Sequence, residues 1–239
     1  MMKRLSLTLT FGLLIFSTVR SQIMEQITDP SNMTLGTLFR NYIFPIENYS
    51  NIKGTPWFLD TAFTNCVLYL RDGRKFAYNK MRMDLYANKI HFLNKDNVEM
   101  VVDDNTVKRI VFLKQGKDTV AGFGFSCDYP SVAKNTPLTY YLEINTGKAQ
   151  VLEYLYKDIG YSQGVTGLAP EKQFEEHKDY FVYNRNHMKM ERLRKNREFV
   201  LAFLNDKREE VSKYISDNKL TCKSIADIVK VFDYYNGLK

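Results

Sequence analysis

Four ionisable side chains in the second half of the chain have the types and spacing of an acid–base or cation-binding site. Glu175, Glu176, His177 and Asp179 lie close together in the sequence. Carboxylates and an imidazole can exchange protons with a substrate or hold a cation. General acid–base catalysis also needs burial that shifts a pKa, and the sequence from residue 161 to 176 indicates an irregular loop or lid. The cluster therefore predicts either a small ionic site or a solvated loop.

Other catalytic signatures are missing from the sequence. His91, His177 and His187 lie on different predicted elements, and no two have metal-ligand spacing. No Gly-x-Ser-x-Gly, His-Glu-x-x-His or phosphate-binding glycine loop occurs. Gly122 and Gly124 lie in a predicted strand, where a bulge or a close backbone approach explains them better. We therefore expect no enzymatic activity and no cofactor, and a hydrolase is only the third hypothesis.

A basic segment, KMERLRKNR at 189–197, is the candidate site for an anionic partner. Its cationic residues are Lys189, Arg192, Arg194, Lys195 and Arg197. They could bind an acidic lipid, a glycan or the acidic face of a protein. The alternative is the solvated side of the first C-terminal helix, with Leu193 facing inward.

The three cysteines give two interpretations. Cys66 and Cys127 lie in the same strand-rich region and are the candidate disulfide if the protein is exported, with Cys222 left over. Alternatively, all three are buried free thiols that act as small hydrophobic residues.

Tyrosines gather in the last strands and allow two interpretations as well. Tyr140, Tyr141, Tyr154, Tyr156 and Tyr161 could line a ligand cavity inside a curved sheet. Cross-strand aromatic pairing would explain the same residues by packing alone.

The first residues predict export. Lys3 and Arg4 precede an apolar stretch from Leu5 to Phe16, which has the length of a signal-peptide core and is too short to span a membrane. We predict a signal peptide at 1–21, cleaved before Gln22. Its removal takes three basic residues and leaves 31 basic against 27 acidic ones, so the net charge falls from +7 to +4. That mild charge and the export signal argue against a nucleic-acid partner, and no later apolar run approaches membrane length.

The mature chain predicts an α+β fold. After an extended leader at 22–53, short strands joined by tight turns over 54–187 indicate an antiparallel meander that curls into a barrel or half-barrel. Gly73 and Asn88 lie in two of these turns. Trp57 is the expected anchor of the core.

The last part of the chain, 188–239, has helical periodicity and predicts a small helical subdomain. Asp206 followed by Glu209, and Ser224 followed by Asp227, indicate two helix starts.

Four segments together resemble a known family. They are GTPWF at 54–58, VLYLRDGR at 67–74, MRMDLYANKIHF at 81–92 and YYN at 234–236. Their order is similar to that of a family of exported, uncharacterised Bacteroidota proteins with a β-meander and a helical tail ending in YYN. The resemblance covers about residues 54–239 and implies a periplasmic or outer-membrane-associated location. In that setting Asp60-Thr61-Ala62 and Asp118-Thr119-Val120 are similar to O-glycosylation signals, with Thr61 and Thr119 as acceptors.

These observations predict a non-catalytic protein of the cell envelope that binds a partner protein or an envelope lipid or glycan. The alternative is a carrier that encloses a small apolar ligand in the curved sheet. An exposed apolar patch would favour the first function, and a wide apolar cavity would favour the second.

Overall fold

The computed structural model describes residues 49–59, 62–115, 120–162 and 169–239. The predicted signal peptide, its cleavage site before Gln22 and most of the leader lie outside these residues, as do Thr61 and Thr119. No helix among the described residues is long and apolar enough to cross a membrane.

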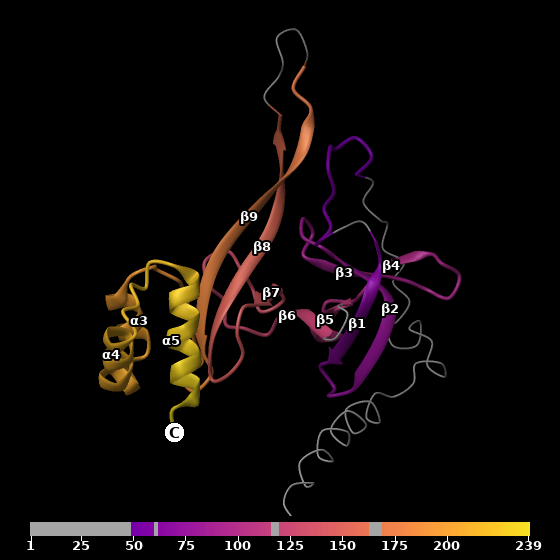
Figure 1. The fold of residues 1–239 in the computed structure, drawn as a ribbon. Coiled ribbons are helices and arrows are strands. Elements are labelled where there is room, and N and C mark those ends of the chain that lie inside the picture. The colour runs from indigo at the N-terminus through magenta and orange to yellow at the C-terminus, as the bar shows by residue number, and fades with distance from the viewer. Residues whose placement is uncertain (1–48, 60–61, 116–119, 163–168) are drawn as a thin grey trace, which may run out of the picture.

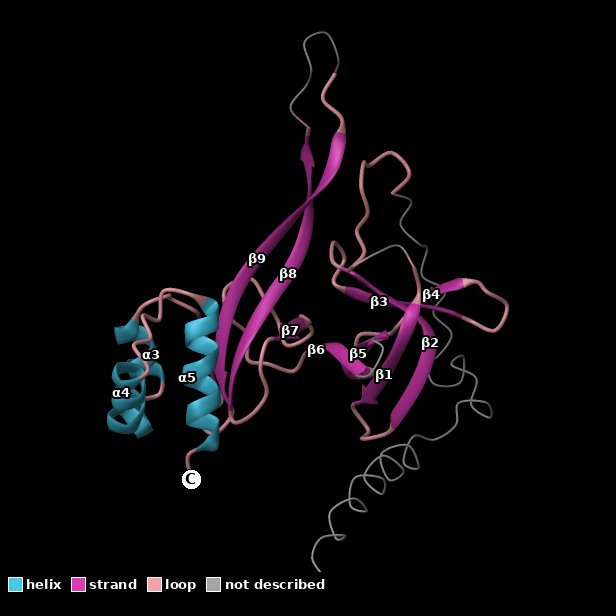
Figure 2. Ribbon diagram, viewed as in Figure 1, coloured by secondary structure: helices cyan, strands magenta, loops and turns pink. Residues whose placement is uncertain are grey.

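The described strands form one ten-stranded antiparallel sheet (Figure 2). The strands are β1 (Thr64–Leu70), β2 (Lys75–Asp84), β3 (Lys89–Leu93), β4 (Glu99–Val101), β5 (Val107–Gln115), β6 (Val120–Ser126), β7 (Tyr141–Glu143), β8 (Ala149–Tyr161), β9 (Lys172–Asn184) and β10 (Lys189–Arg192). Their order is β10-β9-β8-β7-β6-β5-β1-β2-β3-β4. The prediction of an antiparallel sheet followed by helices is confirmed.

The sheet is open and is not a simple meander. β4 and β10 are its two edges, so the strands do not close into a barrel. β1 lies between β2 and β5, because the chain returns after β4 to the free side of β1. β1 is therefore the central strand from which the two halves of the sheet extend.

Two turns have the predicted conformations. Gly73 has φ 89° between β1 and β2, and Asn88 has φ 54° between β2 and β3. Both lie in the left-handed region, which glycine and asparagine tolerate best. The turn chemistry read from the sequence is confirmed at both positions.

β8 and β9 form a long hairpin that extends beyond the rest of the sheet (Figure 1). Each strand has 13 residues, and they pair without a break from Ala149 opposite Asn184 to Tyr161 opposite Lys172. The predicted loop at 161–176 is therefore wrong from Lys172 onward. The outer part of β9 is exposed or half-buried, so it lacks the alternation of buried apolar residues that marks a strand in a sequence.

The helices follow β10 and pack beside this hairpin (Figure 1). They are α3 (Arg197–Phe203), the short 3-10 helix η2 (Asn205–Lys207), α4 (Arg208–Asp217) and α5 (Ile225–Gly237). The predicted helical subdomain at 188–239 thus begins too early, because Lys189–Arg192 is a strand paired with β9.

One of the two predicted helix starts is confirmed. Ser224 Oγ accepts a hydrogen bond from the Asp227 amide at 3.0 Å and caps α5. Asp206 does not cap α4; its carboxylate accepts a 2.8 Å hydrogen bond from the Tyr235 hydroxyl. The competing partner comes from 29 residues away in the sequence, which a local pattern does not reveal.

The YYN segment joins the helices to the sheet. Tyr234 stacks on Tyr214 of α4 with ring centroids 4.0 Å apart, and Tyr235 is fully buried. Asn236 accepts a hydrogen bond from the Ala149 amide at 2.8 Å and donates to the carbonyls of Thr146 and Ala149. The residues that carry the family resemblance here are therefore structural contacts between α5 and the start of β8.

Buried apolar residues form three clusters. The first lies under β1–β6, the second lies between the helices and one face of β8 and β9, and the third lies on the opposite face of that hairpin. Trp57 is 8% exposed and belongs to the core, as predicted.

Lys157 of β8 attaches the long hairpin to the first half of the sheet. Its amide donates to the Leu85 carbonyl at 3.1 Å. Its ammonium group donates to the carbonyls of Thr55 and Trp57 at 2.7 and 3.2 Å. Burial lowers the pKa of this lysine, which is consistent with its position between the two halves.

Candidate functional site

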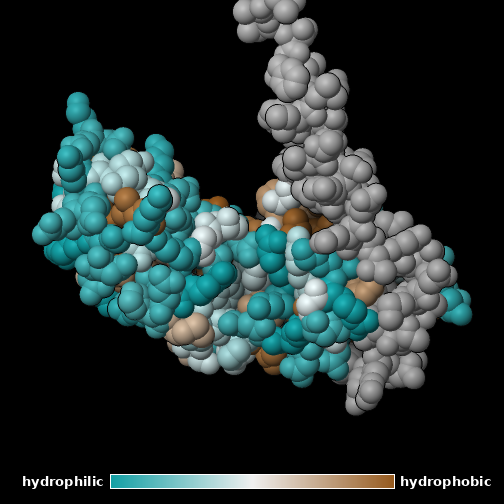
Figure 3. Space-filling view, turned by 90° about the horizontal axis from the view of Figure 1, so that it is seen from below, coloured by the Kyte–Doolittle hydropathy of each residue, from teal (hydrophilic) through white to brown (hydrophobic). Residues whose placement is uncertain are grey.

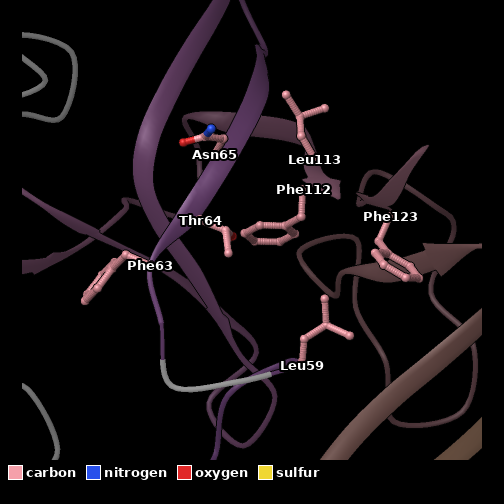
Figure 4. A pocket seen from close by; sticks show the side chains of 7 residues that line it. All are labelled: Leu59, Phe63, Thr64, Asn65, Phe112, Leu113 and Phe123. Carbon is pink, nitrogen blue, oxygen red and sulfur yellow. The ribbon is translucent and has the colours of Figure 1, made fainter. Parts of the chain in front are cut away.

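An apolar groove lies where the segment before β1 passes the ends of β5 and β6 (Figure 4). Its volume is about 520 Å³, within the range of small-ligand sites. It is lined by Leu59, Phe63, Thr64, Asn65, Phe112, Leu113 and Phe123. Five of these seven side chains are large and apolar, so the groove offers mainly hydrophobic contact.

Phe58 and Leu59 shape one side of this groove. The Phe58 ring packs edge-on against Phe123 and Phe125, with centroids 5.3 and 4.9 Å away. The next residue, Leu59, has φ 66° and is 66% exposed. A bulky residue in the left-handed region costs about 1–2 kcal/mol. The chain therefore spends free energy on holding an exposed apolar side chain at the edge of an apolar groove.

Figure 3 shows another face of the molecule, which is mostly hydrophilic, with apolar residues in small separate groups. The large exposed hydrophobic residues are Leu59, Tyr86, Val98, Leu138, Tyr161 and Met188. They come from separate parts of the chain. Of these six, only Leu59 lines the apolar groove.

A second, polar groove lies on the other face of β5 and β6. Its volume is about 470 Å³. It is lined by Tyr69, Leu70, Arg71, Gly73, Lys108, Arg109, Ser126, Cys127, Asp128, Tyr129, Glu143, Gln150, Tyr183 and Arg185. Burial raises the pKa of Tyr129 far above its ordinary value, so its hydroxyl keeps its proton.

The predicted acid–base cluster is only partly assembled. The β8–β9 register places Asp158 opposite Glu175 and brings His177 beside them, with one donor atom of each within 4.8 Å of the others. His177 Nε2 lies 2.8 Å from an Asp158 oxygen. Glu176 lies on the opposite face of the strand, and Asp179 pairs with Arg192 at 2.5 Å. The side chain of Asp158 is 58% exposed, so this set is a solvated ionic cluster on the hairpin.

The predicted anionic-partner patch is spread over three elements. Lys189 and Arg192 lie in β10, Arg194 and Lys195 follow it, and Arg197 begins α3. The segment is therefore not the side of one helix, and the helical interpretation is wrong for its first half. Lys189 pairs with Glu191 at 2.6 Å, and Arg197 donates to Ser212 and Ser216.

The predicted Cys66–Cys127 disulfide is wrong for this fold. Cys66 pairs with Phe112 of β5, whereas the Cys127 amide donates to the Lys108 carbonyl. Their strands lie on opposite sides of β5, about 10 Å apart, and four residues along β5 add about 13 Å. A disulfide needs Cα atoms within about 7 Å. All three cysteines are free and buried, as the alternative interpretation expected.

The tyrosines pack against one another and do not surround a cavity. Tyr140 and Tyr141 are buried in two different core clusters. Tyr154 stacks on Tyr156 with centroids 4.8 Å apart, and Tyr161 is 63% exposed. The packing interpretation is therefore the one that the structure supports.

Sequence reasoning missed a buried ionic network on β2, β3 and β4. Arg82 forms a bidentate ion pair with Glu99, with distances of 2.6 Å, and His91 Nδ1 lies 2.9 Å from the same carboxylate. Burial raises the pKa of Glu99, but the hydrogen bonds and charges of His91 and Arg82 outweigh it, so the pKa lies below its ordinary value. The network depends on strand pairing between residues that are far apart in the sequence.

Asp84 holds the other end of this network. It is fully buried and accepts hydrogen bonds from the amides of Tyr86 and Ala87 and from the Tyr49 hydroxyl, at 2.8–2.9 Å. Because its lone pairs serve the β2–β3 turn, this carboxylate acts in structure. The signal in the sequence was the aspartate two residues before a turn.

Comparisons with protein-family models, curated proteins and solved structures found no match to this chain. The resemblance to the exported Bacteroidota family stays a prediction.

Proposed function

We propose that this protein is a non-catalytic binding protein of the cell envelope and that its apolar groove receives an apolar segment of a partner protein. The observation that carries this proposal is the groove itself, about 520 Å³ in volume, with Leu59 exposed and strained at its edge. Backbone strain at an exposed apolar residue is a feature of sites whose partner supplies the missing contacts.

The energetics favour a partner that covers Leu59. Full burial of a leucine side chain contributes about 1.5–3 kcal/mol. That gain offsets the left-handed backbone cost of about 1–2 kcal/mol, which the free protein bears without compensation. A partner that also contacts Phe63 and Phe123 would bury more apolar area in the same groove.

The ionisable groups support binding over catalysis. Asp84 is used by a turn, Glu99 by Arg82 and His91, and Glu143 by Arg109 and Ser126. A general base needs a lone pair directed at a substrate. These buried carboxylates direct theirs at the protein.

The proposed location depends on the predicted signal peptide and on the family resemblance. In that location the partner is an envelope protein, and the groove meets it after export. A carrier of an apolar ligand is the second candidate, because the groove volume also falls in the range of small-ligand sites.

Site-specific photo-crosslinking tests the proposal. A photoreactive amino acid is placed at Leu59, and as a matched control at Val98, which is also exposed and apolar but lies between β3 and β4. Both variants are expressed and irradiated in the native cells, and the adducts are identified by mass spectrometry.

We expect a specific protein adduct at position 59 and none at 98, with the yield reduced by Phe123→Ser. A lipid adduct at 59 would support the carrier instead. Equal adducts at both positions, or no adduct at 59 in a variant shown to be folded and exported, would contradict both candidates.

A further inference from the structure

The polar groove lies at the narrowest part of the sheet. β6 and β7 share only two residue pairs, Phe125 with Leu142 and Ser126 with Tyr141. The groove crosses this junction, so residues from both halves line it: Tyr69 and Arg109 from the first half, and Gln150 from β8. A ligand in this groove would contact both halves of the molecule at once.

The groove carries excess positive charge. Its charged lining consists of Arg71, Lys108, Arg109 and Arg185 against Asp128 and Glu143, a balance of +2. Both carboxylates are already engaged, Asp128 by Arg71 and Glu143 by Arg109. Within the described part of the chain, neither Lys108 nor Arg185 lies within ion-pair distance of a carboxylate. The unbalanced charge therefore belongs to two exposed cations at the edge of the groove.

The inner part of the groove is fixed in place. Arg109 donates to both oxygens of Glu143 at 2.6–3.0 Å, and Ser126 donates to the same carboxylate. The pair lies across Gly124, where an added Cβ would be 2.5 Å from Glu143 Oε2 and 3.0 Å from Arg109 Nη2. A glycine at this position is what allows the two charged groups to lie flat on the sheet. Preorganised charge of this kind lowers the cost of binding.

Neutral polar groups complete the lining. Tyr129 and Tyr183 are each 6% exposed and pack edge-on with centroids 5.0 Å apart. The Tyr129 hydroxyl donates to Gln150 Oε1 at 3.4 Å, and Gln150 is 4% exposed. The Gln150 side chain also has two N–H groups that can donate to a ligand. A mostly buried polar wall beside exposed cations matches the chemistry of a small polar anion.

We propose that this groove binds a small anionic ligand, with a phosphate or carboxylate group between Lys108 and Arg185 and a polar body, such as a sugar ring, against Tyr129 and Gln150. This site is separate from the apolar groove. Phe112 and Phe123 line that groove from one face of β5 and β6, whereas Arg109 and Ser126 belong to the other face. The inference does not depend on the proposed function.

Calorimetric titration of the full mature chain with glucose 6-phosphate, glucuronate and glucose tests this inference. The comparison is between the wild type, the double variant Lys108→Gln/Arg185→Gln and a control, Lys219→Gln/Lys230→Gln. The control loses the same charge from exposed positions of the helical region. All four positions are exposed, so circular dichroism should show folded protein for both variants.

We expect binding of at least one of the two anionic sugars, tenfold or more weaker in the groove variant and unchanged in the control, with affinity that falls as salt rises. Preference between the two anionic probes identifies phosphate or carboxylate as the recognised group. Equal binding of glucose, equal loss in both variants, or no binding of either anion at millimolar concentration would overturn the proposal.

Discussion

Gly124→Ala should destabilise the protein by displacing the Arg109–Glu143 pair. The new Cβ would be 2.5 Å from Glu143 Oε2, closer than real Cβ contacts occur, and the Glu143 side chain is only 8% exposed. Because the carboxylate cannot move far without losing its hydrogen bonds, we expect Arg109 and Ser126 to lose their shared acceptor.

The expected magnitude follows from two opposing effects. Replacing glycine by alanine in a strand stabilises by about 0.5–1 kcal/mol through reduced backbone entropy of the unfolded chain. Removing one partner of a buried ion pair costs about 3–5 kcal/mol. Arg109 is 31% exposed and both partners remain, so the loss is smaller here. The free energy of unfolding should fall by about 1–3 kcal/mol.

Urea unfolding followed by circular dichroism measures this change. Gly237→Ala is the control, since no atom lies within 4 Å of its added Cβ and it should be neutral or stabilising. The decisive measurement is Gly124→Ala in an Arg109→Ala/Glu143→Ala background, where the clash has been removed. A loss of the same size in that background would refute the proposed cause.

Three further predictions test other parts of the fold. Asn236→Ala removes three hydrogen bonds between α5 and the start of β8 and should lower the unfolding free energy by about 2–3 kcal/mol in urea titrations, more than Asn218→Ala, whose lost bond is local. Burial raises the pKa of Cys66 from 9.0 to about 12 and that of Cys127 to about 11, so native thiol labelling at pH 8 should be about a thousandfold and a hundredfold slower than in urea; ordinary labelling rates, or a mass showing a disulfide, would contradict the fold. The pKa of Glu99 is lowered on folding, so its stabilising contribution is complete above its ordinary pKa of 4.5 and is lost as the pH falls through the lowered value; the stability difference between wild type and Glu99→Gln should therefore shrink in urea titrations carried out from pH 6 to pH 3.

Local chemistry made several parts of the fold predictable from the sequence. Gly73 and Asn88 adopt the left-handed conformations that their turns require, and Ser224 caps the last helix. Each of these features depends on a few consecutive residues. The alternating pattern of β1 and β2 belongs to the same class, since one buried face is enough to define a strand.

Long-range pairing was not predictable from the same evidence. β1 has two partners, and only the neighbouring hairpin with β2 is visible in the sequence. The return of β5 to its other side sets the distance between Cys66 and Cys127 and excludes their disulfide. Asp206 illustrates the same limit on a smaller scale, because Tyr235 competes for the carboxylate that a local pattern assigned to a helix cap.

The candidate sites show why residue types alone gave so little information on function. Arg109 and Glu143 look like ordinary surface charges until β5, β6 and β7 are paired, and the one local signal was the pair of glycines at 122 and 124. The register of β5 with β6 is regular throughout, so these glycines mark close approach and not a bulge. Gly122 leaves room for Val111, and Gly124 leaves room for the ion pair.

The same two strands serve both grooves, because side chains alternate between the faces of a sheet. A shift of one residue in the β5–β6 register would turn Phe112 toward the polar groove and Arg109 toward the core, which would remove both sites together. Single side-chain substitutions act on one face only. Lys108→Gln/Arg185→Gln should therefore leave photo-crosslinking from position 59 unchanged, and Phe123→Ser should leave anion binding unchanged. If either substitution abolished both activities in a folded protein, the two grooves would have to be parts of one site.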